Sequence, residues 1–255
     1  MARSRLSEVD YRLDTFTDTA SGRRYAEVAD AAVTAGSAAR GWGRIYVDLA
    51  GPPHWSVQVP HPHADRYTER LGAEVLRGAP GGVMVLAGAH RKAASGGGGE
   101  GGVGEAGGDG DAEREGRQRP EDDPADMAHR TDSVFHAVVA ELTRRGLPGI
   151  QLHGFADSSV PDTGAVVSTG AGDRAAAEAA GLAAALEGEG VTVCRARDTS
   201  CPLAGRTNAQ GRLAAEHGTR FLHLELSRSL RAHPDPRAGA ARAIACVTEG
   251  WAGRA

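Results

Sequence analysis

The sequence predicts one α/β domain with a mixed, mostly parallel sheet that helices cover on both faces. The first observation is that short runs rich in Val, Ile and Leu alternate with segments of helical periodicity along most of the chain. Such alternation is typical of strand–helix–strand units, whose helices pack against a shared sheet. The second is that 255 residues with only 4% aromatic content can still build one large aliphatic core. We therefore expect one domain rather than two small ones.

Seven strands and five helices are predicted in chain order. The strands are expected at residues 44–49, 55–60, 83–89, 149–155, 165–169, 191–196 and 221–226, and the helices at 66–77, 132–145, 174–186, 212–217 and 236–248. Gly51, Pro52 and Pro53 separate the first two strands, and such a turn would let them pair as a hairpin. Asp132 is the predicted N-cap of the second helix, and Gly146 is expected just after its last turn.

Two segments stand apart from this pattern. Residues 1–42 are expected to be an N-terminal extension, in which 22–39 is compatible with a helix, so that the domain proper spans 43–255. Residues 94–125 are rich in Gly and Glu, and Val103 is their only large apolar side chain. Such a segment cannot bury enough surface to offset its ordering entropy. We expect a disordered insertion, and an inert surface loop is favoured over a mobile lid.

Composition and charge exclude several classes of partner. The net charge of −4 and a pI near 6.2 provide no basic surface for nucleic acid or an anionic membrane. The three cysteines, Cys194, Cys201 and Cys246, have no C-x-x-C spacing, so neither a disulfide framework nor a thiolate zinc site is expected. The first 25 residues contain no apolar signal region, and no apolar run is long enough to cross a bilayer. These observations predict a cytoplasmic protein in a reducing compartment.

Polar residues gather at the ends of the predicted strands. His61, His90, His153 and Glu225 each lie at the end of an apolar run. In open α/β sheets, ligands bind at the carboxyl ends of the strands. The period of two places His223 and Glu225 on the same face of the last strand. A buried carboxylate is strongly disfavoured without a partner. A metal, a cation or a substrate at this edge would supply one.

Two imidazoles and one carboxylate here match a known type of zinc site. His61, Glu69 and His153 would supply the His₂Glu set of catalytic zinc, with a fourth position left for water. The spacing leaves alternatives open, because His63 lies two residues after His61 and His90 also follows a strand. For any one of these histidines taken alone, a hydrogen-bonded or surface imidazole is the favoured interpretation.

The same residues lie within a longer run of motifs. The order VPHP…E, AGAHR, AHRTDS, QLHGF, GRTN and HLELSRSLR resembles the N-formylglutamate amidohydrolase group, and it is similar to poly-γ-glutamate hydrolases and zinc carboxypeptidases. The resemblance covers roughly residues 55–232 outside the insertion. It implies a phosphorylase/hydrolase-like α/β fold, zinc held by His61, Glu69 and His153, and a catalytic Glu225. Glu69 follows His61 by eight residues, a longer spacing than in the carboxypeptidases.

Basic and amide side chains in these motifs are candidates for binding a substrate carboxylate. The candidates are Arg91, Arg130, Arg206 and Asn208. Arg91 and Arg130 each follow a histidine directly, and a guanidinium can hold a carboxylate with two hydrogen bonds or stabilise an oxyanion. The alternative for Arg130 is a structural ion pair with Asp126 or Asp132.

The resemblance implies a metal-dependent hydrolase of amide or peptide bonds. Zinc would activate a water molecule, and Glu225 would take its proton and pass it to the leaving amine. The expected substrate is a small molecule or short peptide-like compound with a carboxylate, either an N-acyl amino acid or a γ-glutamyl amide. The rival hypothesis is a non-catalytic module of the same fold that binds a small acidic ligand. A binding module has no need of a buried general base, so Glu225 favours the enzyme.

Overall fold

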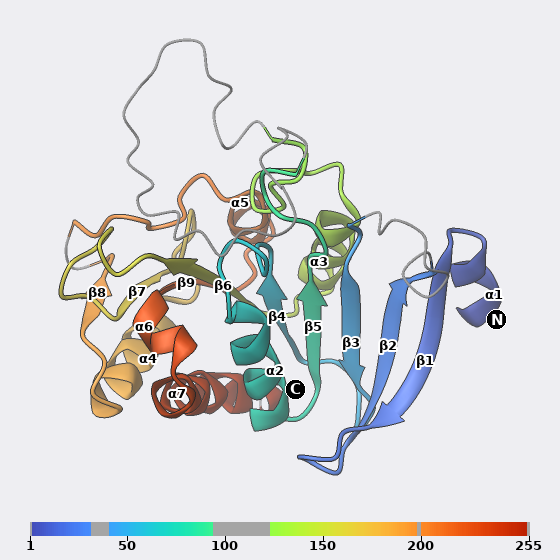
Figure 1. Cartoon of the computed structure of the whole chain (residues 1–255), viewed down its shortest axis with the longest axis horizontal. Helices are drawn as coiled ribbons and strands as arrows, with labels where there is room; N and C mark the ends of the chain where they lie inside the picture. The colour runs from blue at the N-terminus through green and yellow to red at the C-terminus, as the bar shows by residue number, and fades with distance from the viewer. Residues whose placement is uncertain (1, 32–40, 94–122, 198–199, 254–255) are drawn as a thin grey trace.

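The computed structural model describes residues 2–31, 41–93, 123–197 and 200–253 (Figure 1). Most of the expected insertion at 94–125 lies outside these described residues. Its last three residues are described, and Asp123 and Ala125 among them are buried. Among the described helices, none combines the length and the apolar character that a membrane crossing requires.

Nine strands of the described chain form one sheet in the order β1-β2-β3-β5-β4-β6-β9-β7-β8. The strands are β1 (Tyr11–Thr17), β2 (Arg24–Asp30), β3 (Arg44–Asp48), β4 (Trp55–Val59), β5 (Gly82–Leu86), β6 (Gly149–Phe155), β7 (Ala165–Ser168), β8 (Val193–Arg195) and β9 (Phe221–Ser227). The helices are α1 (Ala2–Ser7), α2 (Thr68–Gly78), α3 (Val134–Arg144), α4 (Ala176–Gly188), α5 (Ala209–Glu216), α6 (Arg228–Ala232) and α7 (Pro234–Ala252).

The centre of the sheet is parallel and its flanks are mixed. Strands β5, β4, β6 and β9 run parallel to one another. On one side of them, β1 pairs with β2, β2 with β3 and β3 with β5, each pair antiparallel. On the other side, β7 is antiparallel to β9. Helices α2, α4, α6 and α7 lie on one face and α3 and α5 on the other (Figure 1). The predicted fold class, a mixed α/β sheet covered on both faces, is confirmed.

Alternate residues of the central strands serve two different environments. One face, here called the apolar face, carries Val57, Leu152 and Leu224 and packs against α2, α4 and α7 in the largest hydrophobic cluster. The opposite face, here called the polar face, carries Gln151 and Glu225 at positions between those side chains. Because side chains of a strand alternate between faces, a single run of sequence builds both. The parallel register then aligns the polar residues of neighbouring strands.

Two local possibilities that the sequence left open near the N-terminus are not what the structure shows. The segment 22–39 was compatible with a helix, but its described part contains β2, which pairs with β1 and β3. The turn at Gly51, Pro52 and Pro53 would have let the first two predicted strands pair as a hairpin. Instead β3 pairs with β2 and β5, while β4 pairs with β5 and β6. Strand β4 is buried along its whole length, so it occupies the sheet centre and both its neighbours come from distant sequence.

The boundaries of α3 follow ordinary capping chemistry. Ser133, rather than the expected Asp132, is the N-cap, and its hydroxyl accepts a hydrogen bond from the backbone N–H of His136. Gly146 follows the helix with a φ of 78°, as expected of a glycine that ends a helix.

A disulfide joins Cys194 of β8 to Cys201, and this corrects the prediction of unpaired cysteines. The two Cα atoms lie 5.9 Å apart at a sequence separation of seven. Sequence spacing alone did not reveal this pairing. Since disulfides are typical of oxidising compartments, the cysteines no longer support a reducing one, and the cytoplasmic location stays a prediction. Cys246 is free and exposed.

Candidate metal centre and active site

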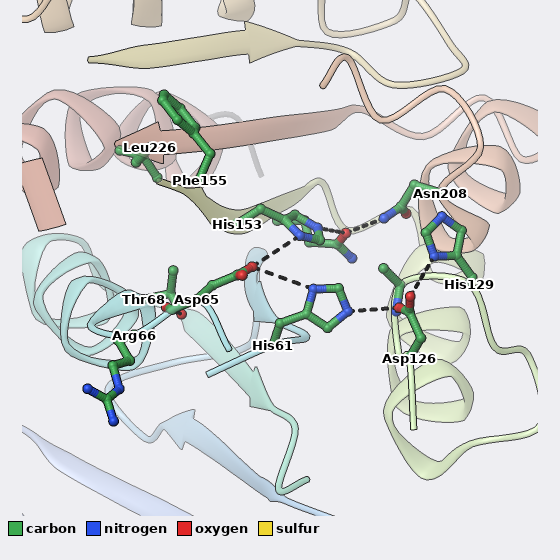
Figure 2. Close-up of polar contacts among 12 residues, drawn as sticks. His61, Asp65, Arg66, Thr68, Asp126, His129, His153, Phe155, Asn208 and Leu226 are labelled. Atoms are coloured by element: carbon green, nitrogen blue, oxygen red, sulfur yellow. Dashed lines mark hydrogen bonds and ion pairs between the residues drawn. The ribbon is translucent and has the colours of Figure 1, made fainter. Parts of the chain in front are cut away.

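Two histidines lie around one carboxylate near the carboxyl ends of β4 and β6 (Figure 2). His61 follows β4, and a tight turn, in which its carbonyl accepts from the backbone N–H of Asp65 at 2.7 Å, brings Asp65 back beside it. One carboxylate oxygen of Asp65 lies 3.5 Å from Nδ1 of His61 and 3.6 Å from Nδ1 of His153. These distances exceed ordinary hydrogen bonds. The three ligand atoms nevertheless lie within 4.8 Å of one another, close enough to share one metal ion.

The outer nitrogen of each histidine is held by another side chain. Nε2 of His61 lies 2.8 Å from a carboxylate oxygen of Asp126, and Nε2 of His153 lies 2.7 Å from the amide oxygen of Gln151. Asp126 is itself bound by Nδ1 of His129 at 3.0 Å. Both Nδ1 atoms therefore turn toward Asp65, an arrangement in which outer-shell partners orient metal-binding imidazoles.

Burial and charge agree with a cation site. His61, Asp65 and His153 are only 3%, 4% and 6% exposed. Burial alone would lower the pKa of His61, but the carboxylates of Asp126 and Asp65 raise it to about 9. Burial would likewise raise the pKa of Asp65, but the imidazoles of His153 and His61 hold it well below its usual range. The buried Nδ1 of His61 has no hydrogen-bond partner among the described residues. A divalent cation fits this donor set, since it would replace a proton on that nitrogen.

Glu225 lies beside this centre on the neighbouring strand β9. It is in register with His153, and His223 is in register with Gln151. Burial, together with the charge of Asp65, raises the pKa of Glu225 to about 8. Burial holds the pKa of His223 well below its usual value, so this imidazole is neutral. The rings of His223 and His153 lie 4.6 Å apart. The prediction that His223 and Glu225 share one face is thus confirmed by the register.

Comparison with known proteins shows which fold this is. Neither a protein-family model nor a curated protein matches the chain. Among solved structures, a bacteriophage poly-γ-glutamate hydrolase aligns over 88% of this chain and 96% of its own, with 11% identity and a TM-score of 0.52. An N-formylglutamate amidohydrolase from Ralstonia eutropha JMP134 aligns over 80% and 95%, with 15% identity and a TM-score of 0.50.

The likeness is one of fold. A metallo-carboxypeptidase from Pseudomonas aeruginosa aligns over 98% of this chain and 68% of its own, with 13% identity and a lower TM-score of 0.46. The names of the first two structures, a poly-γ-glutamate hydrolase and an N-formylglutamate amidohydrolase, coincide with two of the groups that the sequence motifs resemble. The α/β fold that this resemblance implied is therefore confirmed, and the chemistry of the site has to be argued from its own residues.

The structure places Asp65, rather than Glu69, with the two histidines. Glu69 lies in the first turn of α2 and lines two surface hollows, one with Phe16 and Leu76 and the other with Trp42 and His63. The physical reason is that α2 begins only at Thr68, after the turn that has already returned Asp65 to His61. Sequence reasoning missed Asp65, although its spacing of four residues from His61 was a visible signal.

The alternative histidines lie elsewhere. His63 is exposed, and Nδ1 of His90 accepts a hydrogen bond from the backbone N–H of Lys92 at 3.2 Å. Neither belongs to a group of side chains able to share a metal among the described residues. The geometry thus favours His61 over His63 and His153 over His90.

The four candidates for substrate binding have different surroundings. Arg91 lies close enough for its charge to act on Glu225. Arg130 forms an ion pair of 2.5 Å with Asp132, which is the structural alternative that the sequence left open. Arg206 is exposed in a cavity of about 480 Å³, next to Gly205, which packs against the His223 ring.

The side chain of Asn208 is buried and bonded within the protein. Its side-chain oxygen caps α5 by accepting from the backbone N–H of Gly211 at 2.9 Å, and its amide nitrogen donates to Gln151. The side chain is 2% exposed, so both of its polar groups serve the protein interior. The structure thus gives Asn208 a capping and amide-orienting role, and its role in binding a substrate stays a prediction.

Proposed function

We propose that the chain is a zinc-dependent amidohydrolase in which His61, Asp65 and His153 hold the metal and Glu225 is the general base. The observation that carries this proposal is the placement of two Nδ1 atoms 3.5 and 3.6 Å from the same buried carboxylate oxygen. Two imidazoles and one carboxylate form the protein ligand set of catalytic zinc sites that keep a fourth position open. Glu225 lies in register with His153, at the side of this set.

The residues of the chain have separate tasks in this reaction. Bound zinc supplies a water molecule of lowered pKa and a Lewis acid for the scissile carbonyl. Glu225 accepts a proton on its carboxylate and donates it to the nitrogen of the leaving amine. Its metal-free pKa of about 8 reflects burial beside Asp65, and a nearby cation favours the ionised form that a base requires. Asp126 and Gln151 keep the two imidazoles in place.

The proposed substrate is an amide with a nearby carboxylate, such as an N-acyl amino acid or a γ-glutamyl compound. Of the four candidates, Arg91 is the one whose charge acts on Glu225, and it is our first choice to receive that carboxylate. Arg206 is a second candidate, since its loop packs on His223. Two of the aligned proteins act, by their names, on poly-γ-glutamate and N-formylglutamate. Both names describe amides of a glutamate, which supports the same substrate class here.

Metal content of the purified protein is the first test. We expect about one zinc per chain by elemental analysis, with lower occupancy in His61→Ala and His153→Ala. His63→Ala is the matched control, because it removes an exposed histidine only two residues from His61. A protein that takes up no zinc, or one that loses it in the control variant, would contradict the proposed centre.

Turnover is the second test, and it separates an enzyme from a binding module. A panel of N-formyl, N-acetyl and γ-glutamyl amino acids should include at least one substrate whose hydrolysis stops with a chelator and returns with zinc. A zinc-loaded protein that binds these compounds but cleaves none of them would instead support a non-catalytic module.

A further inference from the structure

A chain of buried amide side chains runs beneath the candidate metal centre. Gln58 of β4, Gln151 of β6 and Gln210 of α5 are each no more than 1% exposed. Nε2 of Gln151 donates to the side-chain oxygens of Gln58 and Gln210, both at 3.1 Å. Asn208 donates to the oxygen of Gln151 from the other side. Buried amides are stable only when their donors and acceptors are paired. Three hydrogen bonds join these amides to one another, and their other partners are Ser56, His153, Met127, His136 and Gly211.

Backbone groups at both ends determine which way each amide points. The N–H of Gly211 can only donate, so the Asn208 atom that it meets at 2.9 Å is the oxygen, and its nitrogen faces Gln151. The carbonyl of Met127 can only accept, so the Gln210 atom that it meets at 2.9 Å is the nitrogen, and its oxygen faces Gln151. Gln151 must then present its nitrogen to Gln210 and its oxygen to Asn208.

The orientation of the Gln151 amide determines which ring nitrogen of His153 carries the hydrogen. The Gln151 oxygen lies 2.7 Å from Nε2 of His153 and can only accept, so Nε2 carries the hydrogen. Nδ1 of the neutral ring is then a lone pair directed toward Asp65, which is the form that binds a metal. Asp65 alone would favour the opposite tautomer, with the hydrogen on Nδ1 facing its carboxylate. The amide chain therefore opposes the Nδ1–H tautomer that Asp65 alone would favour.

The start of α5 holds the outer partners of both histidines. Asn208 orients Gln151 on the His153 side. On the other side, the backbone N–H of Ala209 donates to the carbonyl of Ala128 at 2.8 Å, and Gln210 holds the carbonyl of Met127. These two carbonyls belong to the turn that follows Asp126, the partner of His61. One helical turn thus supports both sides of the centre.

We propose that Gln151 is a positioning residue that keeps His153 in the Nε2–H tautomer, with Nδ1 available for the metal, and that the first turn of α5 sets its orientation. The inference rests on the proposed zinc centre and adds residues that do not touch the metal. A buried glutamine at this position is explained by the hydrogen bond to His153.

Zinc affinity in three variants separates positioning from packing. Gln151→Leu removes the acceptor for His153, and we expect zinc to bind roughly 10- to 100-fold more weakly in chelator competition. Gln151→Glu keeps an acceptor oxygen but loses both donors, so zinc affinity should equal or exceed that of the unmodified protein although unfolding becomes easier. Gln58→Leu is the matched control, equally buried in the same chain but not bonded to His153, and its zinc affinity should change less than about threefold.

Nitrogen NMR of the histidine side chains tests the same inference without metal. We expect His153 of the metal-free protein to carry its hydrogen on Nε2, and Gln151→Leu to move it to Nδ1. An Nδ1–H tautomer in the unmodified protein would overturn the inference, as would zinc affinity that follows stability across the three variants. If the protein binds no zinc, the proposed function fails, and the tautomer still decides whether Gln151 orients His153.

Discussion

The two faces of the central strands use the same backbone for opposite purposes. On β9, Leu222, Leu224 and Leu226 are fully buried in the main hydrophobic cluster, whereas His223 and Glu225 between them are buried among ionisable groups. Burying the leucines stabilises the fold by roughly 1.5–3 kcal/mol for each side chain. Burying the polar residues is unfavourable unless each finds a partner. The difference indicates that the apolar face supplies stability to the fold. That stability offsets the cost of burying the polar residues on the other face.

The largest effect should come from the polar face and leave the fold intact. Glu225→Gln preserves size and shape but cannot accept a proton, so we expect turnover to fall by about 10²- to 10⁴-fold. Zinc content and circular dichroism should be unchanged. Glu216→Gln, at the exposed end of α5, is the control and should keep full activity. Normal turnover of Glu225→Gln on an established substrate would exclude it as the base.

Its neighbour on the apolar face should show the reverse. Leu224→Ala opens a cavity against α2, α4 and α7, and we expect the free energy of unfolding to fall by about 2–5 kcal/mol. At a temperature where the variant is folded, its zinc content and kcat should match those of the unmodified protein. The measurements are urea unfolding and steady-state kinetics. A large loss of kcat with little change in stability would mean that the two faces are not functionally separate.

The third prediction decides which carboxylate completes the metal shell. Asp65→Asn should weaken zinc binding by at least roughly 100-fold, because even outer-shell partners contribute 10- to 100-fold. Glu69→Gln is expected to leave zinc affinity unchanged, since Glu69 does not belong to the group of ligand atoms formed by His61, Asp65 and His153 among the described residues. Competition with a zinc chelator measures both. The opposite result would restore the His₂Glu set that the sequence motifs implied.

Patterns that act locally along the chain were predictable from sequence. Alternation with period two identified the strands that carry His153 and Glu225, and the parallel register put these residues side by side. Features that depend on contacts between segments distant in the sequence were not predictable in this way. Strand β2 is stabilised by pairing with β1 and β3 on either side. Asp65, rather than Glu69, lies beside His61 because of a tight turn, and hydrophobic periodicity does not indicate the direction of a turn.

The amide chain is an intermediate case. Gln58 and Gln151 interrupt apolar runs in two strands, and this was visible in the sequence. Their significance appears only in the fold, where the register of β4 and β6 pairs them directly and α5 adds Gln210 from far along the chain. A polar residue within a buried strand is therefore a useful signal, but its partner has to be found in three dimensions.

The smallest expected effect is a pH dependence of the metal-free protein that arises from Glu225. Burial and Asp65 raise its pKa to about 8, while Arg91, Arg231 and His61 act in the opposite direction. The folded protein therefore keeps a proton that the unfolded chain releases near the ordinary value of 4.5. The protonation of Glu225 therefore contributes to the free energy of unfolding, fully below pH 4.5, and this contribution is lost as pH rises through about 8.

Between pH 6.5 and 8 we expect metal-free stability to fall by about 1–2 kcal/mol more in the unmodified protein than in Glu225→Gln, measured by urea unfolding. The raised pKa of His61 acts in the same direction in both proteins, so their difference isolates Glu225. Zinc should remove the difference, because a neighbouring cation stabilises the carboxylate. Equal slopes for the two metal-free proteins would show that Glu225 is already ionised at pH 6.5, and that the polar face tolerates its charge without a metal.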